Sequence, residues 1–207
     1  MKPVIDYSLY LVTDRHYLKG RDFYTCLEDA LKGGITLVQL REKTADEAEF
    51  LTIGHKVLAL CNKYKVPLLI NDNLPVAKKL GAAGVHLGQD DLNMAEARAL
   101  LGPDAIIGIS AHNVEEALLA EQQGADYLGV GAMYPTGSKD DVSVIGPEAL
   151  KKIVQAVKIP VVGIGGITLK TYNDIRKAGA VGCAMISCIL GADDIKGTVQ
   201  VLRDSLK

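Results

Sequence analysis

The sequence predicts an α/β protein that folds as a single (β/α)8 TIM barrel. Eight short apolar runs alternate with eight segments of helical periodicity, at about 26 residues per unit. Several runs are apolar throughout, as parallel strands covered on both faces should be, and 21 glycines suit many tight turns. No linker or shift in composition divides the chain, so we expect one catalytic domain over residues 1–207. A doubly wound open sheet is the alternative architecture.

Each strand is predicted from a short apolar run between turn signals. Val, Ile and Leu dominate these runs, and several change to polar residues at their carboxyl ends. The run at 127–132 leads into a loop rich in glycine, proline and hydroxyl residues. The expected strands are residues 8–14, 36–43, 67–72, 84–89, 105–110, 127–132, 160–166 and 182–187.

A segment of helical character follows each strand. The first helix stops at Gly33 and Gly34, which is a C-terminal signal. Thr44 precedes acids and is expected to cap the second helix, and Thr168 is expected to cap the seventh. Pro147 suits the first turn of the sixth. Counted from their first signal residue, the expected helices are 22–31, 44–64, 74–80, 94–101, 114–123, 146–157, 168–177 and 193–206.

Composition and charge exclude several classes of protein. A chain of 207 residues that is 48% hydrophobic can bury one sizeable core. The net charge of −2 gives no electrostatic case for a nucleic acid or an anionic membrane as partner. Asp6 stands where a signal peptide would be apolar, and no apolar run approaches the roughly 18 residues of a membrane helix. We expect a cytoplasmic protein with small-molecule substrates. Composition does not decide whether it forms a homo-oligomer.

The cysteines and histidines do not indicate a metal site. The four cysteines, Cys26, Cys61, Cys183 and Cys188, form no CxxC motif, and we expect reduced core residues at Cys61, Cys183 and Cys188. The histidines lack the spacing of metal ligands. We expect structural or solvent-facing roles, with His86 the nearest to a site, for His16, His55, His86 and His112.

Polar side chains gather where the predicted strands end. In a barrel of parallel strands, all eight carboxyl ends open on the face that carries the active site. Gln39, Arg41 and Lys43 alternate, so they share one side if the second strand extends that far. The strand ends and their loops supply Gln39, Arg41, Lys43, Asn71, Asp72, Gln89, Asp91, Ser110, Thr136, Ser138, Lys139, Gly165 and Gly166.

These residue types predict two different anion sites. Arg41, Lys43 and Lys139 would repel one another without a ligand, and a diphosphate would neutralise them. Asp72 and Asp91 suit Mg²⁺, which prefers one or two carboxylates together with phosphate oxygens and water. The glycines after the seventh strand and the turn after the eighth suit a monophosphate that is bound by backbone N–H groups. The pair of sites suggests two substrates.

Each of these features also has a simpler interpretation when it is taken alone. Residues 41–43 could be a solvated charge cluster, and residues 71–72 and 90–91 could be turns or helix caps. Gly165 and Gly166 could form only a tight turn. The loop at 129–139 could be an ordinary surface loop. These interpretations do not explain why the polar residues recur at the strand ends.

The chain closely resembles the thiamine-phosphate synthase family. Seven motifs match in order and at the right spacing over nearly the whole chain. They are YLVTD at 10–14, VQLREK at 38–43, IND at 70–72, VHLGQDD at 85–91, GISAH at 108–112, GVG at 129–131 with PTGSK at 135–139, and GIGGI at 163–167. The family often has Thr where this chain has Ser138, which keeps the hydroxyl.

The resemblance implies a transferase that joins an aminopyrimidine methyl diphosphate to a thiazole ethyl phosphate and releases pyrophosphate. It implies that the pyrimidine diphosphate is held by Gln39, Arg41, Lys43, Asn71, Ser110 and Lys139. It implies that Mg²⁺ is held by Asp72 and Asp91. It implies that the thiazole phosphate is held by Thr136, Gly137, Ser138, Gly166, Ile186 and Ser187. Arg41, Lys43 and Lys139 would be catalytic because they stabilise the departing charge.

Three rival functions belong to the same fold or bind the same ligands. An aminothiazole tautomerase lacks the residues that bind pyrophosphate and its metal ion. This chain has all five of them: Arg41, Lys43, Asp72, Asp91 and Lys139. A sugar-phosphate epimerase or an amino-acid biosynthetic isomerase needs a proton-transfer pair at the strand ends. A non-catalytic thiamine-phosphate sensor would bind its ligand and release no pyrophosphate.

Overall fold

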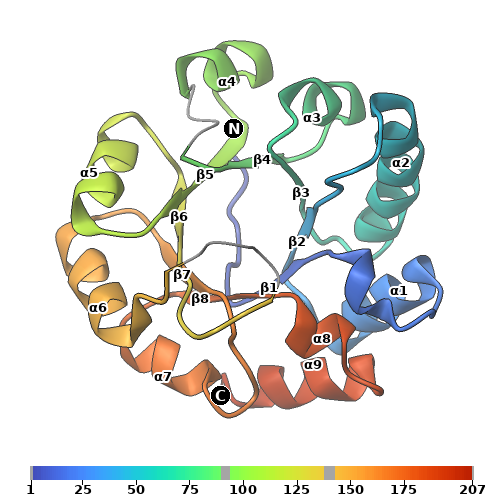
Figure 1. The fold of residues 1–207 in the computed structure, drawn as a ribbon. Helices are drawn as coiled ribbons and strands as arrows, with labels where there is room; N and C mark the ends of the chain where they lie inside the picture. Colours follow the sequence, from blue (N-terminus) through green and yellow to red (C-terminus); the bar gives the residue numbers. More distant parts are fainter. Residues whose placement is uncertain (1, 90–93, 138–142, 207) are drawn as a thin grey trace.

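The structure is a computed structural model that describes residues 2–89, 94–137 and 143–206. Within these residues, eight parallel strands form a closed barrel in sequence order, and helices surround it (Figure 1). The barrel closes where the first strand pairs with the last, with Tyr10 beside Ala184. The predicted (β/α)8 architecture is therefore confirmed, and the open-sheet alternative is wrong.

Seven of the eight strands in the described chain are shorter than the sequence predicts, because each apolar run extends past the paired residues into a turn. Most strands are buried along their whole length, which follows from cover by side chains inside the barrel and by helices outside. The strands are β1 (Leu9–Val12), β2 (Leu37–Leu40), β3 (Leu68–Asn71), β4 (Gly84–Leu87), β5 (Ile106–Ala111), β6 (Tyr127–Val130), β7 (Val161–Ile164) and β8 (Gly182–Met185).

The long helices lie where periodicity predicts them, and α3 and α4 have the predicted bounds. The short helices η1 and α8 have no counterpart in the prediction, because four residues are too few to show a helical period. The helices are η1 (Arg15–Leu18), α1 (Phe23–Gly33), α2 (Glu47–Lys63), α3 (Leu74–Leu80), α4 (Met94–Leu101), α5 (Val114–Gln122), α6 (Gly146–Ala156), α7 (Tyr172–Lys177), α8 (Ser187–Leu190) and α9 (Ile195–Asp204).

Two helices begin at an acidic cap, and at the first of them the cap differs from the prediction. The cap of α2 is Asp46 rather than Thr44, because the Asp46 carboxylate accepts the backbone N–H of Glu49 at 2.8 Å. At α9, which the sequence predicts from residue 193, Asp194 accepts the N–H of Gly197 at 2.8 Å. A short acidic side chain therefore satisfies the first turn of both helices.

The predicted start of α7 is also wrong. Thr168 begins a separate turn, in which its backbone N–H donates to Thr171 Oγ1 at 2.9 Å. Regular α-helix starts only at Tyr172. The residues between β7 and α7 therefore form a longer loop at the carboxyl end of the barrel.

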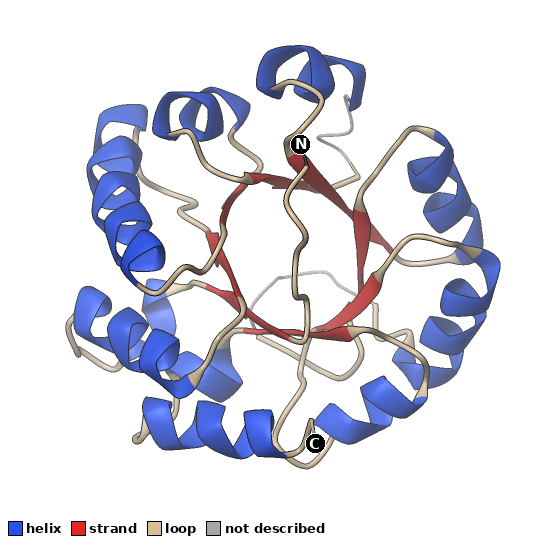
Figure 2. Ribbon diagram, turned by 180° about the vertical axis from the view of Figure 1, so that it is seen from behind, coloured by secondary structure: helices blue, strands red, loops and turns tan. Residues whose placement is uncertain are grey.

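The first and last helices close the outer ring. A Cβ atom added at Gly33 of α1 would lie 2.7 Å from Cβ of Val199 in α9, so this glycine permits the two helices to pack closely. At the amino-terminal end of the barrel, the segment before β1 crosses the opening (Figure 2). Its Tyr7 ring lies 4.7 Å from the Tyr127 ring inside the barrel. No described helix is long and apolar enough to cross a membrane.

Candidate active site

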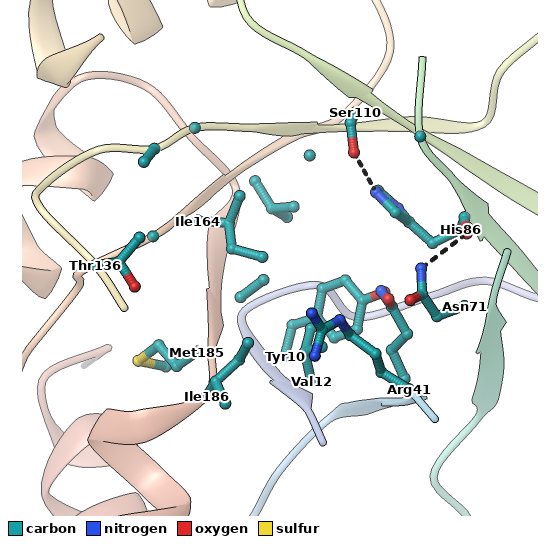
Figure 3. A pocket seen from close by; sticks show the side chains of 18 of the residues that line it. Tyr10, Val12, Arg41, Asn71, His86, Ser110, Thr136, Ile164, Met185 and Ile186 are labelled. Carbon is teal, nitrogen blue, oxygen red and sulfur yellow. Dashed lines mark hydrogen bonds between the residues drawn. The ribbon is translucent and has the colours of Figure 1, made fainter. Parts of the chain in front are cut away.

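A cavity of about 270 Å³ lies at the carboxyl ends of the strands, where the sequence predicts the site (Figure 3). This size suits small molecules. The cavity brings together predicted site residues that come from six strands or the loops after them. The predicted residues that line it are Gln39, Arg41, Lys43, Asn71, Asp72, Ser110, Thr136, Gly166, Ile186 and Ser187.

Four predicted site residues are not placed in this cavity. Gly137 is exposed and is not among the residues that line it. Asp91, Ser138 and Lys139 lie outside the described residues. The assignments of these three residues stay predictions.

The two cations after β2 line the cavity from a loop, not from the strand as predicted. β2 ends at Leu40, so the expected extension of the strand to Lys43 is wrong. Arg41 and Lys43 instead lie in the loop beyond the strand and still line the cavity. The backbone N–H of Arg41 donates to the buried Thr13 hydroxyl at 3.0 Å, and its Nη1 lies 2.9 Å from Asp14 Oδ2. Groups after β1 therefore hold Arg41 in place.

Glu42 lies between these two cations and is turned into the protein. Its side chain is only 5% exposed, and Oε2 accepts from Arg15 at 2.7 Å. Its Oε1 has no hydrogen-bond partner among the described residues. Burial raises the pKa of the Glu42 carboxyl, and the Arg15 guanidinium opposes that rise without cancelling it.

The end of β3 presents a carboxylate to the cavity. Asn71 pairs with His86 in the barrel, and its amide donates to the His86 carbonyl at 3.5 Å. Asp72 has a left-handed backbone, with a φ of 59°, and its N–H donates to the same carbonyl at 2.9 Å. Asp tolerates this conformation better than most residues do. The turn therefore directs the chain so that Asp72 lines the cavity mouth.

This donor set fits a magnesium ion that arrives with a phosphate ligand. Asp72 offers hard carboxylate oxygens, and Mg²⁺ is commonly held by one or two carboxylates, with phosphate and water completing its shell. No group of three or more His, Cys, Asp or Glu side chains in the described part of the chain could hold a metal ion by itself. The second predicted ligand, Asp91, falls outside that part.

The opposite side of the cavity has a different character, because backbone groups and hydroxyls dominate it. Gly165 and Gly166 follow β7 with φ values of 94° and 65°, in the region that favours glycine. A Cβ atom at Gly166 would lie 2.6 Å from the carbonyl oxygen of Pro135. The N–H of Tyr134 donates to the Gly165 carbonyl at 3.0 Å. The start of the loop after β6 therefore rests on the β7 turn, which brings Thr136 to the cavity.

Four further polar residues line the cavity. Gln89 is among the predicted strand-end residues and His86 is the histidine expected nearest to a site, whereas Tyr10 and His112 have no predicted role there. Tyr10 and His86 enter from strand interiors, and His86 Nε2 lies 3.0 Å from Ser110 Oγ (Figure 3). Gln89 donates to the Ser110 carbonyl. His112 Nδ1 lies 2.9 Å from Glu116 Oε2, and the residue also lines the cavity. The sequence predicts only a structural or solvent-facing role for it. Tyr10 and Val12 alternate with Leu9 and Leu11 along β1, and this spacing is the sequence signal that could have indicated the inward face.

The apolar wall of the cavity comes mainly from β7, β8 and the residues that follow strands β6, β7 and β8. Aliphatic side chains exclude water from the space between the two polar ends. None of them was among the predicted site residues except Ile186, because apolar strand residues are indistinguishable from core in a sequence. The wall comprises Val12, Ala132, Val162, Ile164, Ile167, Ala184, Met185 and Ile186.

The cysteines are free thiols, as predicted, and they do not line the cavity. Cys26, Cys61 and Cys183 are buried. Burial raises the pKa of both Cys61 and Cys183 to about 12. A thiol with such a pKa is not ionised near neutral pH, so neither residue is suited to nucleophilic catalysis.

Comparison with known proteins agrees with this geometry. The Thiamine monophosphate synthase family model matches residues 9–189. Thiamine-phosphate synthase of Clostridium acetobutylicum is 50% identical over 203 residues, which cover 98% of this chain and 96% of the relative. The corresponding protein of Alkaliphilus oremlandii is 46% identical, and the match covers 98% and 97%.

A solved structure shows the same fold at a similar level of relatedness. Thiamine phosphate pyrophosphorylase from Pyrococcus furiosus superposes with a TM-score of 0.89 at 40% identity, over 96% of this chain and 95% of that chain. The match therefore spans the barrel and the loops that form the cavity. The chain belongs to the thiamine monophosphate synthase family, whose members are transferases of thiamine biosynthesis.

Proposed function

We propose that this chain joins 4-amino-2-methyl-5-(diphosphooxymethyl)pyrimidine to a thiazole ethyl phosphate, which gives thiamine monophosphate and pyrophosphate. The observation that carries the proposal is one cavity with two chemically different ends. One end has the cations Arg41 and Lys43 with the carboxylate Asp72, and the other has the glycine turn at Gly166 with the Ser187 hydroxyl. A diphosphate and a monophosphate match these ends in charge.

The diphosphate binds at the cationic end. Arg41 offers a planar fork of donors for bidentate contact with phosphate oxygens, and Lys43 adds a point charge. Asn71 is placed beside them by β3, and Lys139 from the loop after β6 supplies a third cation. Both Arg41 and Asp72 line the same mouth, so opposite charges are available for the phosphate and for a metal ion.

Magnesium would be the cofactor at this end, where Asp72 and Asp91 would hold it. When it is bound, Mg²⁺ neutralises charge on the departing pyrophosphate. The carboxylate of Asp72 is exposed at the cavity mouth, where a hydrated ion can reach it. Arg41, which is held by Thr13 and Asp14, and Lys43 contribute to the same stabilisation from the loop after β2.

The aminopyrimidine ring lies between Gln39 and Ser110, and the thiazole phosphate lies at the glycine end. Thr136, Gly166 and Ser187 surround the monophosphate with hydroxyls and backbone N–H groups. Gly137, Ser138 and Ile186 extend this set through their backbone or hydroxyl groups. The two reacting rings then meet beside the apolar wall.

The reaction follows from the charges on the two substrates. The C–O bond to pyrophosphate breaks first, and the electron-rich aminopyrimidine stabilises the cation that forms at its methylene carbon. The thiazole nitrogen then attacks this carbon and forms the new C–N bond. The apolar wall keeps water from the cation, and Arg41, Lys43 and Lys139 hold the leaving group. A carboxylated thiazole would lose CO₂ after the bond has formed.

Pyrophosphate release tests this function. The protein should release pyrophosphate only when Mg²⁺ and both substrates are present, and chelation of Mg²⁺ should stop the release. Asp72→Asn should require more Mg²⁺ for half-maximal rate, whereas Asp29→Asn on the surface of α1 should not. No release with both substrates and Mg²⁺ would overturn the proposal. Conversion of a thiazole tautomer without the pyrimidine would identify the tautomerase alternative.

A further inference from the structure

Five side chains form a continuous hydrogen-bonded series across the barrel interior, which we call the relay. Gln39 Nε2 donates to Tyr10 Oη, and Tyr10 Oη lies 2.8 Å from Tyr127 Oη. Tyr127 Oη lies 2.8 Å from His86 Nδ1, and His86 Nε2 lies 3.0 Å from Ser110 Oγ. The relay connects β2, β1, β6, β4 and β5. Both of its end residues line the active-site cavity.

The relay is buried, and two glycines provide the space for its rings. Tyr127 is 0% exposed and Tyr10 is 1% exposed, so bulk water does not compete for their hydroxyls. A Cβ atom at Gly108 would lie 2.1 Å from Cζ of Tyr127, and one at Gly129 would lie 2.8 Å from Cε1 of His86. Neighbouring strands therefore lack side chains where the rings of the relay lie.

The number of protons in the relay determines its direction. Burial raises the pKa of Tyr10 and Tyr127, so each phenol stays neutral and has one O–H to donate. Because Tyr10 accepts from the Gln39 amide, its own O–H donates to Tyr127. Tyr127 then donates to His86 Nδ1. An imidazole that accepts at Nδ1 carries its proton on Nε2, so His86 donates to Ser110 Oγ.

The direction of the relay decides what each end can offer to a ligand. Gln39 uses an amide N–H inside the relay and keeps its amide oxygen as an acceptor. Ser110 accepts from His86 and keeps its O–H as a donor. If Gln39 or Ser110 exchanged its donor or acceptor role within the relay, the direction of every hydrogen bond in the series would have to reverse, because each phenol has a single proton. The two ends are therefore coupled.

We propose that the relay gives the cavity an acceptor at Gln39 and a donor at Ser110, and thereby selects a heterocycle that has both an amino N–H and a ring nitrogen lone pair. Tyr10, Tyr127 and His86 are positioning residues for this selection. The inference rests on the proposed function, because the aminopyrimidine substrate has this pattern. Its 4-oxo analogue presents a carbonyl and a ring N–H, which is the opposite pattern.

Competition between these two pyrimidine diphosphates tests the relay. The ratio of kcat/KM for the 4-amino and 4-oxo substrates should fall at least about tenfold in Tyr127→Phe, because the ends are no longer coupled. The KM for the thiazole phosphate should not change. Tyr7→Phe is the matched control, since Tyr7 stacks on Tyr127 and its hydroxyl makes no hydrogen bond of the relay. A wild-type ratio in Tyr127→Phe would overturn the proposal.

The tautomer of His86 gives a second measurement, which does not depend on turnover. Nitrogen-15 NMR of the wild-type protein should show His86 with Nδ1 unprotonated and Nε2 protonated, with the signals assigned from His86→Asn. A proton on Nδ1 would overturn the proposed direction. If the wild-type protein turned over no pyrimidine, the proposed function would fail, and the tautomer would still test the relay.

Discussion

The guanidinium Nη1 of Arg41 lies 2.9 Å from Asp14 Oδ2, so the acid that follows β1 holds the cation that follows β2. Both side chains are largely buried, at 12% and 19% exposure, which strengthens the pair relative to one in open solvent. A second contact, from the Arg41 N–H to Thr13, fixes the backbone at the same place. The cation is thereby held at the cavity before any ligand binds.

Asp14→Asn should lower kcat by roughly tenfold, because Arg41 loses the charge that orients it. The KM for the pyrimidine diphosphate should not rise, since the substitution also removes a negative charge near the bound anion. Asn can still accept the His16 N–H, which Asp14 Oδ1 accepts at 3.0 Å. Steady-state kinetics measure both quantities. Asp193→Asn is the control, because that acid pairs with Lys19 and is 96% exposed; an unchanged kcat in Asp14→Asn would refute the positioning role.

Lys139→Ala should reduce turnover by about a hundredfold or more, because it removes a cation that we assign to the departing pyrophosphate. The fold should be retained, as circular dichroism and the unfolding midpoint would show. Lys152→Ala, on the exposed side of α6, removes the same charge at a distance from the cavity and should leave turnover unchanged. Equal activities of the two variants would remove Lys139 from the catalytic set.

Gly166→Ala should weaken binding of the thiazole phosphate and lower stability by about 1–3 kcal/mol. The new methyl group would meet the Pro135 carbonyl at 2.6 Å and push the β6 loop off the β7 turn. Gly81→Ala is a close control, because Gly81 has a φ of 64°, against 65° for Gly166, with nothing within 4 Å of its added Cβ. Only Gly166→Ala should raise the KM for the thiazole phosphate. Similar KM values for the thiazole phosphate in the two variants would show that backbone strain alone, and not contact with Pro135, explains the loss of stability in Gly166→Ala.

The strand-end rule explains how much of the site could be predicted from the sequence. Because parallel strands in a barrel share one active face, Arg41, Asn71 and Ser110 could be grouped from the positions of the apolar runs alone. The bounds of β2 could not be predicted, since the sequence stays compatible with a strand beyond Leu40. Pairing with β1 and β3 sets where that strand ends.

The relay could not be predicted by this rule. Tyr10 and Tyr127 are 117 positions apart and sit in apolar runs, where tyrosine is an ordinary core residue. Only closure of the barrel brings their hydroxyls together, and only the missing side chains of Gly108 and Gly129 leave room for the rings. A single sequence has no pattern that records this proximity.

Glu42→Gln should stabilise the protein at pH 7. Burial raises the pKa of the Glu42 carboxyl above its ordinary value of 4.5, despite the Arg15 guanidinium, so ionisation costs more in the folded state than in the unfolded state. The unfolded chain therefore loses this proton first as pH rises, and the contribution of Glu42 to stability falls through the folded pKa. Glutamine keeps the shape without the charge.

The stabilising effect of Glu42→Gln should disappear with acid, which separates it from a simple packing effect. Well below the ordinary pKa of 4.5 the wild-type carboxyl is protonated in both states, so the urea midpoints of the two proteins should converge there. Glu47→Gln is the control, because Glu47 pairs with Lys79 at the surface, with half of its side chain exposed, and a surface pair contributes little. If Glu42→Gln were less stable than wild type at pH 7, the ion pair with Arg15 would outweigh the cost of burying the charge, and the unpartnered Oε1 would not be a source of instability.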